Sequence, residues 1–112
     1  VLAMSDGAPV ASGQLVCYSS SVEIADLVVA PVYRGQGVGT ALIDVLSRVA
    51  RYAGYDSVEI CVMRGNDRAR ALYERLGFVQ DREFTIRDEA SVIVLRKELE
   101  DDAEGSPGGA IR

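Results

Sequence analysis

The stretch LVVAPVYRGQGVGT, residues 27–40, joins a β-branched run to a glycine-rich turn and then to the start of a helical pattern. Glycine accepts the left-handed backbone that such a turn needs, and its lack of a side chain lets a ligand approach the main chain. The helix that follows presents unpaired N–H groups and the positive end of its dipole, which suits a phosphate. A tight strand-to-helix turn without a ligand would need the same glycines, so the glycines alone leave both interpretations open.

Two known nucleotide-binding motifs differ from this turn. A Walker loop requires Lys followed by Ser or Thr after its last glycine, whereas Thr40 follows Gly39 directly, so that motif is excluded. A dinucleotide fingerprint spaces its glycines as G-x-G-x-x-G, whereas the three glycines here are evenly spaced. Glu59, in the next strand-like run, keeps the dinucleotide alternative open at this point.

Outward from the turn, the spacing of apolar residues predicts two helices and six strands. Helical spacing covers residues 38–53 and 67–76, with Gly54 and Gly77 as C-terminal stops and Asn66 as the N-cap of the second helix. This order of elements predicts a mixed α/β sheet with helices packed on its faces. The strand-like runs are residues 1–4, 10–18, 22–29, 57–63, 78–86 and 90–97.

The length of 112 residues fits one domain, which we place at residues 1–99. Residues 100–112 combine acidic residues with Gly and Pro, and we expect a disordered tail there. The formal charge is −5, and four acidic residues and one arginine in the tail account for −3 of it, which leaves −2 on the rest. A general basic surface for nucleic acid is therefore excluded, although seven arginines against five acidic residues between positions 34 and 75 suit a phosphorylated cofactor.

The chain contains no histidine, which excludes a Ser-His-Asp or Cys-His catalytic arrangement and removes the commonest metal ligand. The two cysteines, Cys17 and Cys61, lie in separate apolar runs, so we expect reduced core residues and no metal site. No apolar run approaches the ~20 residues that cross a bilayer, and the N-terminal residues lack a signal-peptide pattern. We therefore expect a soluble, cytoplasmic protein without a membrane partner.

Two motifs in order along the chain resemble the GNAT family of N-acetyltransferases. Arg34, Gly37 and Gly39 match the family's coenzyme A signature, and residues 27–33 are similar to the strand that precedes it. The resemblance implies the acyl-CoA N-acyltransferase fold with a mostly antiparallel sheet. The family normally places a strand and two helices before the first hairpin, so we expect a GNAT fold that lacks those elements. A second set of residues is similar to the family's second cofactor motif: Asn66, Ala69, Leu72, Tyr73, Gly77 and Phe78.

The resemblance also implies where acetyl-CoA binds as co-substrate, without a metal. Backbone N–H groups where the third strand-like run ends would polarise the thioester carbonyl, and the glycine-rich turn would hold the pyrophosphate. Asn66 would contact the pantetheine arm or the acyl group. The residues implied in cofactor binding are Leu27, Val28, Val29, Arg34, Gly35, Gln36, Gly37, Val38, Gly39, Thr40, Asn66, Ala69 and Tyr73.

Two side chains are implied in catalysis. Tyr73 matches the family's general acid for the thiolate leaving group, although its helical spacing also fits a plain core position. Glu23 lies four residues before Leu27, where part of the family carries a glutamate base, although an exposed strand glutamate would look the same. Asp26 is the second candidate base, and the period of two along a strand predicts that it lies on the opposite face from Glu23.

The function implied is transfer of an acetyl group from acetyl-CoA to a primary amine of a small molecule or peptide by direct attack on the thioester. The alternative is a non-catalytic acetyl-CoA-binding sensor or partner subunit, since the elements that build one wall of the acceptor pocket are not seen. The apolar edge strand at residues 1–4 is unpaired in the absence of an earlier strand. We therefore expect a homodimer or strand pairing with another chain.

Overall fold

The computed structural model describes residues 1–87 and 90–100, which form one six-stranded sheet with two α-helices and a short 3-10 helix. All of the strands and α-helices expected from the sequence are present, with ends within two residues of those predicted, and the 3-10 helix is an addition. The elements are β1 (Leu2–Ser5), β2 (Ala8–Cys17), β3 (Val22–Val29), η1 (Pro31–Tyr33), α1 (Val38–Tyr52), β4 (Ser57–Met63), α2 (Asp67–Arg75), β5 (Val79–Ile86) and β6 (Ala90–Glu98).

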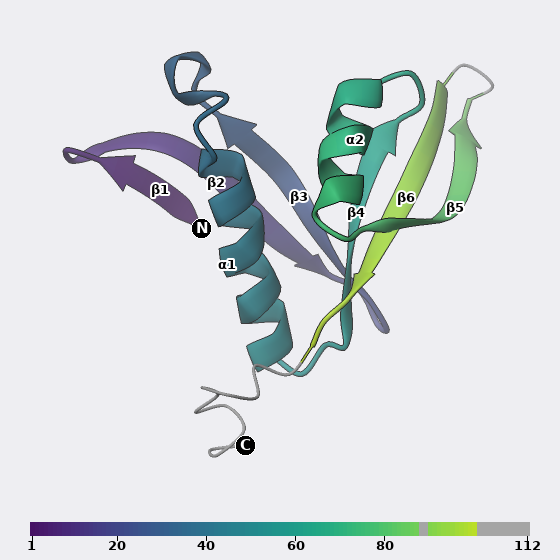
Figure 1. Ribbon diagram of the computed structural model, residues 1–112. Coiled ribbons are helices and arrows are strands. Elements are labelled where there is room, and N and C mark those ends of the chain that lie inside the picture. The colour runs from purple at the N-terminus through teal and green to yellow at the C-terminus, as the bar shows by residue number, and fades with distance from the viewer. Residues whose placement is uncertain (88–89, 101–112) are drawn as a thin grey trace.

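The strand order in the sheet is β1-β2-β3-β4-β6-β5. Every neighbouring pair is antiparallel except β3 and β4, which run parallel, so the predicted mixed and mostly antiparallel sheet is confirmed. The connections through α1 and through α2 both step in the same direction across the sheet. Right-handed crossovers therefore place both helices on the same face (Figure 1).

The core lies between the helices and this face of the sheet. Leu42, Ile43, Leu46 and Ala50 of α1 are buried. Their partners alternate along each strand, as the period of two requires. The residues between them, such as Glu59 of β4, point to the other face, which no helix covers in the described part of the chain (Figure 1). The buried strand partners include Val22, Ile24, Val58, Ile60, Val62, Ile93 and Leu95.

The strands β3 and β4 pair over a short length and then diverge. Their parallel ladder contains only the pairs Glu23 with Glu59 and Ile24 with Ile60. Beyond it β3 carries a bulge, because three steps from Ala25 to Val28 oppose two steps on β2, and Asp26 adopts φ 52°. A bulge bends its strand and increases the local twist. The C-terminal half of β3 therefore turns away from β4, and in Figure 1 it runs between α1 and α2.

Two predictions about the periphery need comment. Cys17 is exposed at the last position of β2, so its assignment to the core is wrong, whereas Cys61 is half-buried; both cysteines are free. The apolar run containing Cys17 ends at a turn, where a side chain has fewer neighbours. The predicted tail lies, from residue 101 onward, outside the described residues. Within residues 1–87 and 90–100, no helix is long and apolar enough to cross a membrane.

Candidate functional site

The glycine-rich turn delivers a set of free backbone N–H groups to the start of α1. Gly35 and Gly37 adopt φ values of 77° and 83°, and a Cβ on either would meet no described atom within 4 Å. The left-handed backbone therefore requires glycine here, and the space in front of it is open. Gly37 is the N-cap of α1 and contributes no side-chain cap, so the N–H groups of Val38, Gly39 and Thr40 have no intrahelical acceptor. This arrangement fits an anionic phosphate.

The side chains of the turn hold it against the end of β3. Arg34 Nε donates to the carbonyl oxygen of Val29 at 3.0 Å, and Gln36 Nε2 donates to the carbonyl oxygen of Val32 at 3.0 Å. The Arg34 side chain is exposed, three residues before the N-cap of α1. Arg34 therefore has a structural role in joining the turn to β3, in addition to the charge that it places there.

At the end of β3, beyond its ladder with β4, the backbone groups of Val29 are not used in pairing with β2. Ala30 N–H donates to the carbonyl oxygen of Val10 on β2 at 2.8 Å. Because consecutive residues of a strand direct their backbone groups to opposite sides, the N–H and C=O of Val29 face away from β2. Arg34 takes the carbonyl oxygen. By the same alternation Val28 faces β2, whereas the N–H of Val29 is directed to the other side of β3.

The second motif forms the start of α2. Asn66 is the N-cap, as predicted, since its Oδ1 accepts from Ala69 N–H at 3.3 Å. Tyr73 packs against the core and meets Phe78 edge to face, with ring centroids 6.2 Å apart. Burial raises the pKa of the Tyr73 phenol above its ordinary value, so the hydroxyl keeps its proton at neutral pH. The ring is thus a core element, while the hydroxyl makes no hydrogen bond to the described residues.

Glu23 lies on the face of the sheet that carries no helix, just before β3 leaves β4. Tyr18 hydroxyl donates to Glu23 Oε1 at 3.1 Å. The neighbour of Glu23 across the parallel ladder is Glu59, which is buried at 8% exposure. The Glu59 carboxylate accepts hydrogen bonds from both terminal nitrogens of Arg82, at 3.0 and 3.1 Å. Cys61 completes this group: burial, followed by the nearby carboxylates, raises the pKa of its thiol to about 11.

Asp26, the second candidate base, is exposed at the bulge of β3 and accepts a hydrogen bond from Gln14 Nε2. Gln14 stands opposite Ala25 in the antiparallel ladder, on the same face as Glu23. The prediction that Asp26 lies on the opposite face does not hold, because the positive φ at the bulge interrupts the alternation. The carboxylate is directed toward β2 and is separate from Glu59.

The roles of Glu59, Arg82 and Tyr18 are not evident from the sequence. A glutamate inside the apolar run 57–63 is the one local signal, since a charged residue there needs a partner if it is buried. No group of three or more His, Cys, Asp or Glu side chains that could hold a metal occurs among the described residues.

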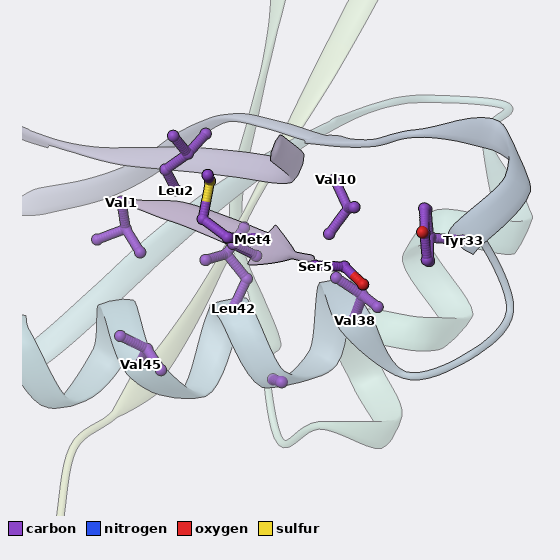
Figure 2. Close-up of a pocket in the computed structure, with 11 residues that line it drawn as sticks. Val1, Leu2, Met4, Ser5, Val10, Tyr33, Val38, Leu42 and Val45 are labelled. Carbon is purple, nitrogen blue, oxygen red and sulfur yellow. The ribbon is translucent and has the colours of Figure 1, made fainter. Parts of the chain in front are cut away.

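A separate apolar groove of about 520 Å³ lies between β1 and α1. Figure 2 shows Met4 from β1 and Leu42 and Val45 from α1 at its borders. Val38 is the one residue that the groove shares with the predicted cofactor set, and neither Tyr73 nor Glu23 lines it. The groove is therefore distinct from the gap between β3 and β4.

Residues 1–78 match the model of the Acetyltransferase (GNAT) family. The chain belongs to the GNAT family. Mycothiol acetyltransferase from Beutenbergia cavernae is 47% identical over 74 residues, which are 65% of this chain and 25% of that protein. Thialysine N-epsilon-acetyltransferase from Bos taurus is 37% identical over 57 residues, 51% of this chain and 34% of that protein. This GNAT chain thus spans about a quarter to a third of the length of these relatives.

Solved GNAT structures share the fold. A GNAT family acetyltransferase from Elizabethkingia anophelis with acetyl-CoA bound superposes with a TM-score of 0.77 at 19% identity, over 88% of this chain and 74% of that one. Ard1 from Thermoplasma volcanium gives a TM-score of 0.76 at 26% identity, over 85% and 66% of the two chains. The predicted acyl-CoA N-acyltransferase fold is confirmed, and the dinucleotide-binding alternative is excluded.

Proposed function

We propose that this GNAT chain binds acetyl-CoA and transfers its acetyl group to a primary amine of a small molecule or peptide by direct attack on the thioester. One observation carries the proposal: the free N–H groups of Val38, Gly39 and Thr40 lie beside Val29, at the end of β3 that has diverged from β4. A group of backbone donors suited to an anion and the diverging end of β3, with the Val29 N–H, thus lie at the same end of the sheet.

The N–H groups at the start of α1 would hold the pyrophosphate of acetyl-CoA, with Arg34 adding positive charge. The thioester would lie in the gap, where Val29 N–H can donate to the carbonyl oxygen. Negative charge develops on that oxygen as the amine attacks, and a fixed donor directed at it is worth about 3 kcal/mol in acyl transfer. Backbone geometry, and not side-chain identity, supplies this contribution.

Two side chains would transfer the protons of the reaction. The amine nitrogen forms a bond to the carbonyl carbon, and the carbon–sulfur bond breaks with its electron pair on sulfur. Glu23 accepts the proton that the amine loses, and Tyr73 gives its phenolic proton to the coenzyme A thiolate. The Tyr73 phenol, whose pKa is raised by burial, is protonated at neutral pH, as a proton donor must be.

For the acceptor amine we propose only that it is cationic. The residues before the acidic tail carry a net charge of −2, which favours approach of a cationic amine. A cytoplasmic location belongs to the same proposal and agrees with two free cysteines.

Pairing of β1 with a second copy also stays a proposal, supported by the exposed edge and by the apolar groove beside it (Figure 2). Light scattering at micromolar concentration tests it, and a well-folded monomer would contradict it.

Thiol release from acetyl-CoA across a panel of amines, combined with calorimetry of acetyl-CoA binding, tests the function. Amine-dependent release with micromolar binding is the expected result. Binding without turnover on any amine would support the alternative, a non-catalytic acetyl-CoA sensor or partner subunit. Absence of binding would refute both functions.

A further inference from the structure

The face of the sheet opposite the helices carries a polar group of residues drawn from three strands. We call Glu23 of β3, Glu59 and Cys61 of β4, and Arg82 of β5 the carboxylate cluster. Glu59 is the one charged residue that is buried among those described, at 8% exposure. Arg82 is half exposed and reaches in from β5 to bind both carboxylate oxygens. The transfer mechanism above uses Glu23 and leaves the Glu59–Arg82 pair without a role.

The Glu59–Arg82 pair is weak evidence for stability, because desolvation of the buried Glu59 carboxylate offsets much of its attraction to Arg82. An apolar pair of similar size would serve the fold equally well. The position of Glu59 suggests a different reason for the pair. Glu23 and Glu59 are direct neighbours in the parallel ladder, and their side chains extend from the same face of strands about 4.8 Å apart.

Two neighbouring carboxylates disfavour each other's ionisation unless a cation compensates one of them. Arg82 binds Glu59, and Asp81 Oδ2 in turn accepts from Arg82 at 2.7 Å. A second cation, Arg96 of β6, stands opposite Glu59 in the antiparallel ladder and is paired with Glu98 at 2.9 Å.

Glu23 accepts a hydrogen bond from the Tyr18 hydroxyl and is also within hydrogen-bond reach of the Cys61 thiol. Both carboxylates raise the pKa of the Cys61 thiol, and Arg82 lowers it. All of these groups are therefore within electrostatic reach of Cys61.

We propose that Arg82 is a positioning residue for acetyl transfer: by pairing with Glu59 it offsets the negative charge next to Glu23, the group that would accept the proton of the acceptor amine. This inference rests on the proposed role of Glu23. It assigns to a residue of β5 a part in the reaction that involves no contact with acetyl-CoA or the amine.

The test compares pH–rate profiles of four variants of the full chain. Arg82→Gln removes the cation that binds Glu59, and Arg96 stays paired with Glu98. The acidic limb therefore moves up by about one pH unit, and the lost rate returns at higher pH. Glu59→Gln/Arg82→Gln removes the uncompensated charge, so the limb returns to its wild-type position. Arg64→Gln is the matched control, since Arg64 forms a similar two-point pair with Glu83, at 2.5 and 2.7 Å, outside the cluster. Glu23→Gln reports on the base itself.

If Arg82 has a purely structural role, the activity of the double variant should be no higher than that of Arg82→Gln. The inference is overturned if Arg82→Gln has the same profile as Arg64→Gln, or if the double variant is not rescued. Thermal melts of each variant separate these effects from unfolding. If Glu23→Gln retains full activity, the proposed base is wrong. If Glu23→Gln is inactive but the pH–rate profile of Arg82→Gln matches that of the wild type, the base stands and the role of Arg82 is wrong.

A second readout does not depend on turnover. In a Cys17→Ser background Cys61 is the sole thiol, and its alkylation rate at pH 8.5 follows the thiolate fraction. Arg82→Gln should slow this alkylation about threefold, and the double variant should reverse the loss. An alkylation rate that is the same in all of these proteins would show that the cluster is not electrostatically coupled, and the inference would fail.

Discussion

Replacement of Gly37 by alanine separates the binding role of the turn from its backbone requirement. The residue adopts φ 83°, and an added Cβ would meet no described atom within 4 Å. The cost to folding is therefore conformational alone, about 1 kcal/mol for a non-glycine residue in the left-handed region. For a domain of this size that cost lowers Tm by about 4–8 °C.

The effect on acetyl-CoA should exceed this cost. Gly37 is the N-cap of α1, so relaxation of its φ reorients the N–H groups of Val38, Gly39 and Thr40 that would bind the pyrophosphate. Loss of one charge-assisted hydrogen bond is worth about 1.5–3 kcal/mol. We therefore expect the Kd for acetyl-CoA to rise by about tenfold or more, measured by calorimetry on the folded protein.

Gly54 provides the matched control. It adopts φ 103°, also with no described atom within 4 Å of an added Cβ, but it follows the C-terminal end of α1. Gly54→Ala should lower Tm by a similar amount and leave the Kd unchanged. If the two variants bind acetyl-CoA equally well, the start of α1 is not the phosphate site and the reasoning is refuted.

Three further predictions concern single side chains. Tyr73→Phe should lower kcat at least tenfold while the Kd for acetyl-CoA changes less than twofold, and an unchanged kcat would leave Tyr73 as core only. Phe78→Ala should reduce the free energy of unfolding by about 3–5 kcal/mol in urea titrations, because Phe78 is 2% exposed, whereas Phe84→Ala, at 46%, should cost much less. At pH 8 about one Cys61 in a thousand is thiolate, given a pKa of about 11, so mass spectrometry should find the exposed Cys17 alkylated first; equal rates would contradict the burial of Cys61.

Local patterns predicted the elements well because their signals are local. The run 57–63 became β4 without a change of bounds, and Asn66 caps α2 through a bond to a residue three positions away. The turn at residues 34–40 was recognisable for the same reason, since its glycines meet a backbone requirement within the turn itself. Family membership and fold followed from these motifs in order.

Long-range geometry was not predictable in this way. The bulge at Asp26 has no sequence marker, because aspartate tolerates both strand and left-handed backbone, yet it turns β3 away from β4 and moves the Asp26 carboxylate toward β2. The pairing of Glu59 with Arg82 joins residues 23 positions apart through a sheet order that periodicity does not reveal. Val29 could be distinguished from Val28 as the donor to the gap only after the register with β2 was known.

The transfer itself is tested most directly by NMR of acetyl-CoA that carries a ¹³C-labelled acetyl carbonyl, mixed with the protein and a panel of cationic amines. We predict that the thioester carbonyl signal declines as an amide carbonyl signal grows, only when both the protein and an amine are present. A thioester signal that persists with every amine, or one that converts to acetate at the same rate without amine, would contradict amine acetylation by this chain.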